Sequence, residues 1–143
     1  MKLKLKSADL KAVEAHASKN FPRECCGLLL GKFGKNVIKV KKVVEAENVL
    51  DSPVAFEVDA ELVFKAIERA EKSGLELVGI YHSHPNLAAY VSARDSEIMK
   101  LWPGVAWLIV SAVKERIVER KAYMLRGDRI EKLKIEVHSM ARP

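Results

Sequence analysis

Short segments with the composition and alternation of β-strands recur along this chain, and their order constrains its fold most strongly. Three of them follow one another near the C-terminus, at Val105–Ala112, Ile117–Leu125 and Ile130–His138. Strand-like segments this close together favour pairing through short turns. Further strands are predicted at Lys2–Lys6, Cys25–Gly31, Asn36–Glu45, Ala55–Val58 and Leu75–Tyr81. Turns are expected at Phe33-Gly34-Lys35, near Lys114-Glu115 and at Gly127-Asp128.

Three helical segments lie between these strands. Ser7 is placed to cap a helix over Ala8–Asn20, Asp59 begins a second that ends at Ser73 before Gly74, and the third is Ser92–Trp102. We therefore predict an α+β fold in which a mixed, mostly antiparallel sheet is flanked by helices in a three-layer αβα arrangement. A length of 143 residues predicts a single domain over residues 1–143.

Composition excludes several classes of protein. Hydrophobic residues make up 49% and charged residues 31%, which is typical of a globular protein and not of a disordered one. Because no apolar run is long enough for a membrane span or a signal peptide, we expect a cytoplasmic protein without a membrane partner. The adjacent pair Cys25 and Cys26 does not form a disulfide framework, which is consistent with a reducing compartment.

The net charge of +6 leaves the class of partner open. The basic residues are distributed over strand-like stretches such as KLKLK, IKVKK and IEKLKIEV instead of one helix with interleaved aromatic residues. We therefore interpret them as a solvated surface and do not expect nucleic-acid binding. The chain has no Gln and no Thr and carries much of its charge on Lys and Glu, a bias reported for proteins from very hot environments.

Candidate metal ligands lie at the end of the predicted Leu75–Tyr81 strand. His82 and His84 are two positions apart, so on extended backbone both imidazoles point to the same face and can converge on one ion. Asp95 follows in the first turn of the next predicted helix and can add a carboxylate oxygen. Two histidines and one acidic residue leave a fourth position open, which is typical of a catalytic zinc that activates water.

Two further residues complete a hydrolytic site. A hydrolase needs a carboxylate to move protons between water and the leaving amine, and Glu24, at the start of an apolar strand, is the candidate. Ser92 lies between the histidines and Asp95 and can donate a hydrogen bond to the oxyanion. The spacing of Ser92 and Asp95 also fits a helix capping box, and the two roles are compatible. Packing in the core is the favoured interpretation of at least one of the two cysteines, and the reactivity of both stays open.

At this point the residues resemble the JAMM (MPN+) metalloprotease family. The signature is a glutamate upstream, then His-Ser-His, seven intervening residues and Ser-x-x-Asp, and Glu24, His82, His84, Ser92 and Asp95 occupy all its positions. The resemblance implies the fold of that family, which is similar to cytidine deaminase. It also implies Zn²⁺ bound by the two histidines and the aspartate, Glu24 as general base and acid, and Ser92 as a stabiliser of the tetrahedral intermediate.

The resemblance also implies a substrate. Family members cleave isopeptide bonds between ubiquitin-like modifiers and lysines, and stand-alone archaeal relatives act on small archaeal modifier proteins. A Gly-Gly tail is then expected to lie extended in a groove between the segment around Asn48–Phe56 and the loop Asn86–Val91, held by backbone pairing. The alternative within hydrolases is an enzyme that trims sulfur-carrier proteins after Gly-Gly. The resemblance leaves the oligomeric state open, with a homodimer among the expectations.

An alternative from another class is a scaffold or nucleic-acid-binding module with a structural metal. Structural zinc ordinarily takes four protein ligands, and only three are well placed here, which argues against this alternative.

Overall fold

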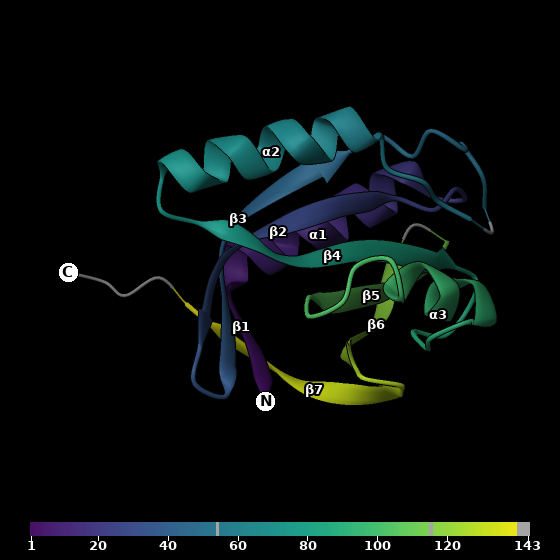
Figure 1. Cartoon of the computed structure of the whole chain (residues 1–143). Helices are drawn as coiled ribbons and strands as arrows, with labels where there is room; N and C mark the ends of the chain where they lie inside the picture. The colour runs from purple at the N-terminus through teal and green to yellow at the C-terminus, as the bar shows by residue number, and fades with distance from the viewer. Residues whose placement is uncertain (54, 115, 140–143) are drawn as a thin grey trace.

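The computed structural model describes residues 1–53, 55–114 and 116–139, which form seven strands and three helices (Figure 1). The strands are β1 Lys2–Lys6, β2 Cys26–Gly34, β3 Val37–Ala46, β4 Glu76–Pro85, β5 Ala106–Val113, β6 Arg116–Arg126 and β7 Arg129–His138. The helices are α1 Ser7–Asn20, α2 Ala60–Lys72 and α3 Ala93–Met99. Within the described residues, no helix is both long and apolar enough to cross a membrane.

The strands form a closed mixed barrel in the order β1-β3-β2-β4-β5-β6-β7. The ring closes because β1 pairs in parallel with β7, so that Leu3 lies opposite Ile135 and Leu5 opposite Val137. The predicted three-layer αβα arrangement is therefore wrong, since such a sheet keeps two free edges and here the two edge strands pair with each other. This pairing joins the two ends of the chain, and no local pattern reports it.

The buried side chains form two apolar clusters on opposite faces of β2 and β4. Leu29 and Val78 belong to the first cluster, together with residues of α1, β1 and β5 to β7. Leu28 and Ile80 belong to the second, together with residues of α2 and α3. In Figure 1, α2 lies outside the barrel, and α1 lies on the other side of β2 and β4. Because β2 and β4 are buried on both faces, their sequences are nearly continuous apolar runs.

Several element boundaries differ from the predicted ones. Helix α1 begins at Ser7 itself, and the residue before it, Lys6, makes no side-chain cap. Strand β2 continues through the predicted turn at Phe33-Gly34-Lys35, because the reversal occurs at Lys35 and Asn36, where Asn36 has a φ of 58°. Of the predicted turn at Lys114-Glu115, Lys114 has a φ of 51° and Glu115 lies outside the described residues.

Two predicted elements are shorter or absent. Helix α3 ends at Met99 instead of Trp102. Ala55–Val58 is not a strand. The carbonyl of Ala55 and the amide of Glu57 both hydrogen-bond to the side chain of Asn48, so backbone groups that a ladder would use have a different partner. By contrast, the Asp59 side chain caps α2 by accepting a hydrogen bond from the amide of Glu61.

Closure of the barrel makes a testable prediction about β1. Leu3 is fully buried in the first apolar cluster, whereas Lys4 points outward from the same strand. We expect Leu3→Ala to lower the free energy of unfolding by about 2–5 kcal/mol, because it removes apolar contacts and leaves a cavity. The matched variant Lys4→Ala is expected to change it by no more than about 0.5 kcal/mol. Urea titration of both variants measures the difference, and equal effects would contradict the buried position of Leu3.

Candidate active site

Strand β4 carries both histidines on one continuous stretch of extended backbone. The sequence predicts that this strand ends at Tyr81, but it runs to Pro85 because His82 to Pro85 pair in register with β5. On the other side, the amide of Ser83 donates to the carbonyl of Cys25 at 3.1 Å. The side chains of His82 and His84 therefore point to the same face, and both are buried.

Asp95 reaches both imidazoles from the first turn of α3. Its carboxylate oxygens lie 3.1 Å from Nε2 of His82 and 3.0 Å from Nε2 of His84. The two Nε2 atoms are 3.2 Å apart. The structure thus brings the three predicted ligands together as a buried group whose candidate ligand atoms all lie within 4.8 Å of one another.

The capping box predicted for α3 is present together with these contacts. The Ser92 hydroxyl oxygen accepts a hydrogen bond from the amide of Asp95 at 3.0 Å, and Oδ2 of Asp95 accepts one from the amide of Ser92 at 3.1 Å. The box holds the Asp95 carboxylate at the start of the helix, where it can also face the histidines. Since the Ser92 oxygen is the acceptor in this bond, its hydroxyl hydrogen is available to a further acceptor.

Hydrogen bonds and burial together set the protonation of His82, His84 and Asp95. Nδ1 of His84 lies 2.9 Å from the carbonyl of Ala88, so we assign the proton to Nδ1, which leaves a lone pair on Nε2. Burial lowers the pKa of His82. Burial also acts to lower the pKa of His84, but its hydrogen bonds to Asp95 and Ala88 outweigh that effect and raise it. For Asp95, burial acts to raise the pKa, and the contacts with both histidines hold it well below its usual range.

The donor set fits a metal ion. Two imidazole nitrogens and a carboxylate form the nitrogen and oxygen set that zinc accepts in catalytic sites. In addition, Nδ1 of His82 is buried with no hydrogen-bond partner among the described residues, so no protein group fixes the tautomer of this ring, and a cation at Nε2 would do so by leaving the proton on Nδ1. A cation facing the Nε2 atoms would use the lone pairs that otherwise point at one another.

Aromatic side chains enclose the histidines. Phe56 stacks on His82 with ring centroids 4.6 Å apart and planes inclined by 21°. Trp107, a member of the second apolar cluster, lies with its ring at 75° to that of His82, and the ring centroids are 6.1 Å apart. Tyr90 lies edge-on to His84 at 5.5 Å. These contacts restrict both rings to one orientation, which a preorganised metal site needs.

Glu24 lies two residues before the start of β2 and is buried with one carboxylate oxygen, Oε1, lacking a partner among the described residues. Burial raises the pKa of Glu24 to about 7, and the nearby charges of His84 and Asp95 act on it in opposite directions. A bound cation would oppose this increase. A buried carboxylate without a partner is costly, which makes its position at this site informative.

The backbone at Glu24 is held from two sides. Its amide donates to the carbonyl of Ser52 at 2.8 Å, and its carbonyl accepts from the side chain of Asn48 at 3.0 Å. The amide of Cys25, the next residue, donates to the hydroxyl of Ser83 at 2.8 Å. The serine between the two histidines therefore links the Glu24 segment to β4.

Asn48 is a positioning residue that the sequence did not reveal. Its side-chain nitrogen donates to the carbonyls of Glu24 and Ala55, and its oxygen accepts from the amides of Leu50 and Glu57. One buried amide thereby satisfies four backbone groups, which is its full hydrogen-bonding capacity. An Asn in a segment of loop composition is common, so no local signal distinguishes this one from an ordinary turn residue.

The loop between β4 and α3 is anchored by strands β5 and β6. The Ser111 hydroxyl donates to the carbonyl of Leu87, the Tyr123 hydroxyl donates to the carbonyl of Ala89 at 2.8 Å, and Glu119 accepts from the Ala89 amide at 2.8 Å. This loop presents Tyr90 to His84 and supplies the carbonyl that bonds the same ring. The anchoring residues lie more than twenty positions further along the chain, which explains why sequence patterns did not identify them.

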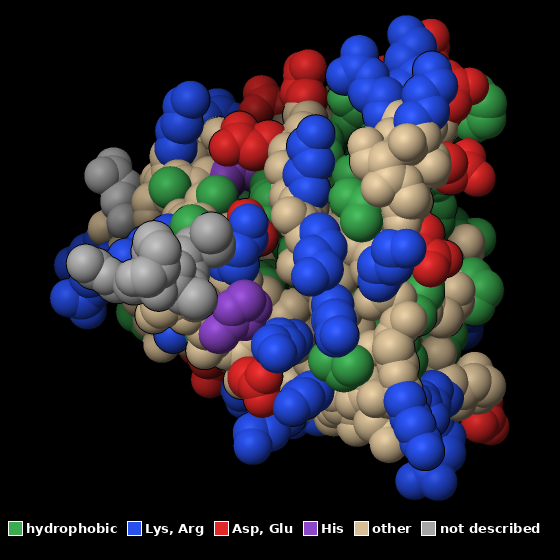
Figure 2. All heavy atoms as spheres, turned by 90° about the vertical axis from the view of Figure 1, so that its left-hand side faces the viewer, with side chains coloured by type: hydrophobic (Ala, Val, Ile, Leu, Met, Phe, Trp, Pro, Cys, Tyr) green, Lys and Arg blue, Asp and Glu red, His purple; other side chains and the backbone are tan. Residues whose placement is uncertain are grey.

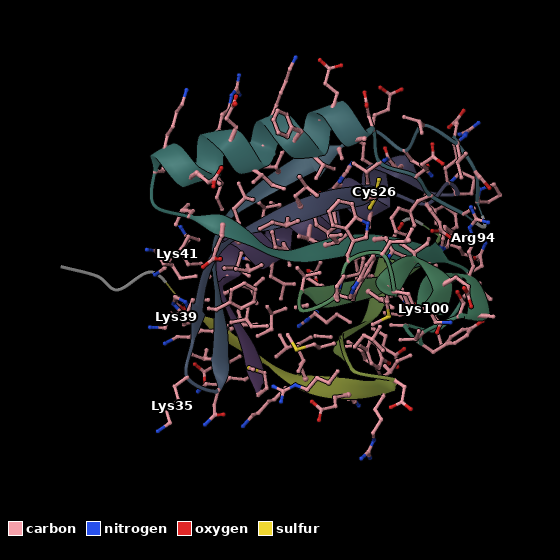
Figure 3. The ribbon with its side chains drawn as sticks, in the orientation of Figure 1. Cys26, Lys35, Lys39, Lys41, Arg94 and Lys100 are labelled. Atoms are coloured by element: carbon pink, nitrogen blue, oxygen red, sulfur yellow. The ribbon has the colours of Figure 1, made fainter. Side chains whose placement is uncertain are left out.

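Both cysteines are fully buried, and Cys26 lies between β2 and α2 (Figure 3). Burial raises the pKa of each thiol to about 12. Their burial agrees with the favoured role in packing, and we predict that neither thiol is reactive in the folded protein, because inaccessible neutral thiols are poor nucleophiles.

Comparison with known proteins identifies the family. A profile of the prokaryotic homologues of the JAB domain matches residues 7–125. This chain belongs to that family. The resemblance to JAMM (MPN+) proteins is therefore confirmed, and proteins of the JAB type typically depend on a metal.

Relatives of this JAB-domain protein are named as proteases and peptidases. It is 44% identical over 115 residues to a desampylase of Pyrococcus furiosus, covering 80% of this chain and 76% of the relative. It is 37% identical over 87 residues to a probable TtuB-protein conjugate cleaving protease of Thermus thermophilus, and the match covers 60% of this chain and 55% of the relative. It is 29% identical over 119 residues to a CysO-cysteine peptidase of Mycobacterium tuberculosis, and the match covers 82% of this chain and 80% of the relative.

A solved structure has the same fold. The solution structure of a protein from Desulfitobacterium hafniense superposes on this JAB-domain protein with a TM-score of 0.85 and 28% sequence identity. The superposition covers 96% of this chain and 94% of the other.

Removing the Asn48 side chain tests its positioning role. We expect Asn48→Ala to lower the free energy of unfolding by about 1–3 kcal/mol, because buried backbone groups lose their partners. Urea titration measures this, with the exposed neighbour substitution Val49→Ala as the matched control. A variant as stable as the control would contradict the role assigned to Asn48.

Thiol accessibility is a second test of the site region. In the folded protein we expect no modification of Cys25 or Cys26 by iodoacetamide at neutral pH, and modification of both after unfolding in guanidinium chloride. Intact-mass spectrometry counts the adducts in each state. Rapid labelling of the folded protein would show that the burial described above is incorrect.

Proposed function

We propose that this JAB-domain protein is a zinc-dependent isopeptidase that releases ubiquitin-like modifier proteins, of the small archaeal modifier type, from lysine side chains after a Gly-Gly tail. The observation that carries the proposal is the buried group of His82, His84 and Asp95 together with Glu24, whose carboxylate has an unpartnered oxygen. The names of the desampylase and conjugate-cleaving relatives support the substrate class.

In this proposal Nε2 of His82, Nε2 of His84 and the Asp95 carboxylate hold the zinc. When bound, zinc activates a water molecule and polarises the scissile carbonyl. Three protein ligands favour this role over a structural one, because closed structural sites ordinarily take four, and the ligand group within the described residues has three.

Glu24 moves the proton. Its carboxylate accepts a proton from the attacking water while the water oxygen bonds to the carbonyl carbon. It then delivers that proton to the lysine amine as the carbon–nitrogen bond breaks, so Glu24 ends the cycle ionised. The Ser92 hydroxyl donates a hydrogen bond to the carbonyl oxygen as that oxygen gains negative charge.

In this proposal two segments hold the substrate tail. Phe56 contacts His82 from one side, and Tyr90 contacts His84 from the loop between β4 and α3. These residues belong to the segments that the sequence suggested as walls of the groove. A tail that passes between these two aromatic side chains would favour glycine, which has no side chain to accommodate. The cytoplasmic location and the homodimer stay predictions.

The roles of Glu24 and the ligands are tested together. We expect Glu24→Gln to lower kcat by about 10²–10⁴-fold and to keep its zinc, because the side chain moves a proton without binding the metal. Asp95→Asn is expected to lose both zinc and activity. Plasma mass spectrometry measures zinc per chain, and cleavage of a Gly-Gly-Lys isopeptide measures activity.

Glu97→Gln, an exposed substitution on α3, is the matched control for loss of one carboxylate and is expected to resemble the wild type. A Glu24→Gln variant with the wild-type kcat would contradict the assignment of the base. A folded wild-type protein that takes up no zinc would contradict the metal site.

The second candidate function is processing of a sulfur-carrier protein, and the similarity to the CysO-cysteine peptidase favours it. Both substrates present an extended Gly-Gly tail to the same site, so the comparison must be kinetic. The two substrates are a lysine-linked conjugate and a carrier protein with a C-terminal extension. Mass spectrometry follows the cleavage of each and gives its kcat/KM. We expect the conjugate to be the better substrate, and the opposite ranking would favour the carrier.

A further inference from the structure

The three basic stretches that are separate in the sequence become neighbours in the barrel. KLKLK is β1, IKVKK lies in β3 and IEKLKIEV lies in β7, and β1 pairs with both of the others. Their outward positions carry lysines, whereas the alternate positions Leu3, Ile38 and Leu133 are buried in the first apolar cluster. The two-residue alternation that places apolar side chains in the core therefore also places the lysines together on one outer face.

Register places these lysines in rows across the strands. Lys4 lies opposite Lys39 of β3, and Lys2 lies opposite Lys134 of β7. Neighbouring strands are about 5 Å apart and alternate residues about 7 Å apart, so the ammonium groups are close enough to act on one polyanion. We define the lysine face by its six members, which are Lys2, Lys4, Lys6, Lys39, Lys41 and Lys134.

Within the described residues, two carboxylates pair with three of these six lysines, and no ion pair is found for Lys39, Lys41 and Lys134. Glu136 accepts ion pairs from Lys2 at 2.8 Å and from Lys4 at 3.7 Å, and Asp9 lies 4.0 Å from Lys6. Figure 2 shows this side of the molecule, where Lys and Arg side chains run in a band over the sheet. Figure 3 shows Lys35, Lys39 and Lys41 projecting away from the barrel on that side.

The face also contains a small hollow. It has a volume of about 110 Å³ and is lined by Lys4, Lys39, Val40, Lys41 and His138. Three lysines and a histidine around one depression can donate hydrogen bonds to an anionic oxygen group from several directions. Three of the six lysines of the face therefore border a concave surface.

The separate basic stretches do not predict nucleic-acid binding from sequence, but their pairing in the barrel changes this interpretation. We propose that the lysine face binds the phosphate backbone of nucleic acid without sequence specificity. Protein–protein interfaces are depleted of lysine and have an apolar centre, whereas here the rows of register partners on the outer face are lysines, Val37, Glu136 and His138. Interfaces with nucleic acid are strongly basic and polar. The face has no aromatic platform among those positions, which favours backbone contacts over base stacking.

The face is separate from the candidate active site. On β3, Lys39 is seven residues before Ala46, which pairs with Cys26 beside the site, and this corresponds to about 23 Å along an extended strand. Binding of nucleic acid is therefore expected to be compatible with hydrolysis, and the proposal holds whether or not the proposed isopeptidase activity is correct.

The test compares two triple variants with the same change in charge. Lys4→Gln/Lys39→Gln/Lys134→Gln neutralises the lysine face, and Lys65→Gln/Lys100→Gln/Lys114→Gln removes three exposed lysines elsewhere. Fluorescence anisotropy measures binding to labelled single-stranded RNA and to DNA of the same sequence over a range of salt concentrations. Thermal unfolding of both variants controls for folding.

We expect the control triple variant to bind RNA and DNA as tightly as the wild type does. The lysine-face triple variant is expected to bind both about tenfold or more weakly than the wild type at low salt. Its slope of log K against log salt should be smaller in magnitude by about 2, since three phosphate contacts are lost. Equal binding by the two folded triples would overturn the proposal. Poly-glutamate of matched charge binding as tightly as RNA would overturn it in favour of an acidic protein partner.

Discussion

The position of β4 between β2 and β5 determines most of what this molecule can do. Because its backbone is paired with β5 as far as Pro85 and with β2 as far as His82, the side chains of His82 and His84 project from the same face of a fixed strand. Ser83 between them points to the opposite face, where its buried hydroxyl accepts a hydrogen bond from the amide of Cys25 and so holds the segment that carries Glu24. One strand therefore supplies two candidate ligands and positions the candidate base. The positions of His82, His84 and Glu24 depend on this strand, whereas Ser92 and Asp95 are positioned by the start of α3.

Asp95 combines two electrostatic tasks that are usually separate. A carboxylate at the start of a helix satisfies an orphan backbone amide, and here the same oxygen also faces His84. The helix start thus compensates part of the cost of burying a negative charge next to two imidazoles. The arrangement keeps Asp95 ionised by direct contacts, in a pocket where burial alone would favour its neutral form.

The candidate site was predictable from sequence where its geometry is local. The two-residue spacing of His82 and His84 and the capping pattern that places Asp95 are properties of short segments, so they could be recognised without a fold. Asn48 and the residues that anchor the loop between β4 and α3 act on backbone that is distant in sequence, and their residue types are ordinary for their surroundings. The same reason explains the error in architecture, since Leu3 and Ile135 meet only after the whole barrel has formed. The lysine face also arises from this long-range pairing.

Closure of the barrel has a further consequence for association. Each strand in the ring has a neighbour on either side, but the pairs do not extend over the full length of every strand. Because β1 pairs with β3 only along Val37–Lys39, the stretch of β3 from Val40 to Ala46 has a strand partner only in β2. Closure therefore shortens the edges that are open to edge-to-edge association without removing them. A further strand that pairs with this chain through its backbone has to do so along such a stretch or along a segment outside the ring.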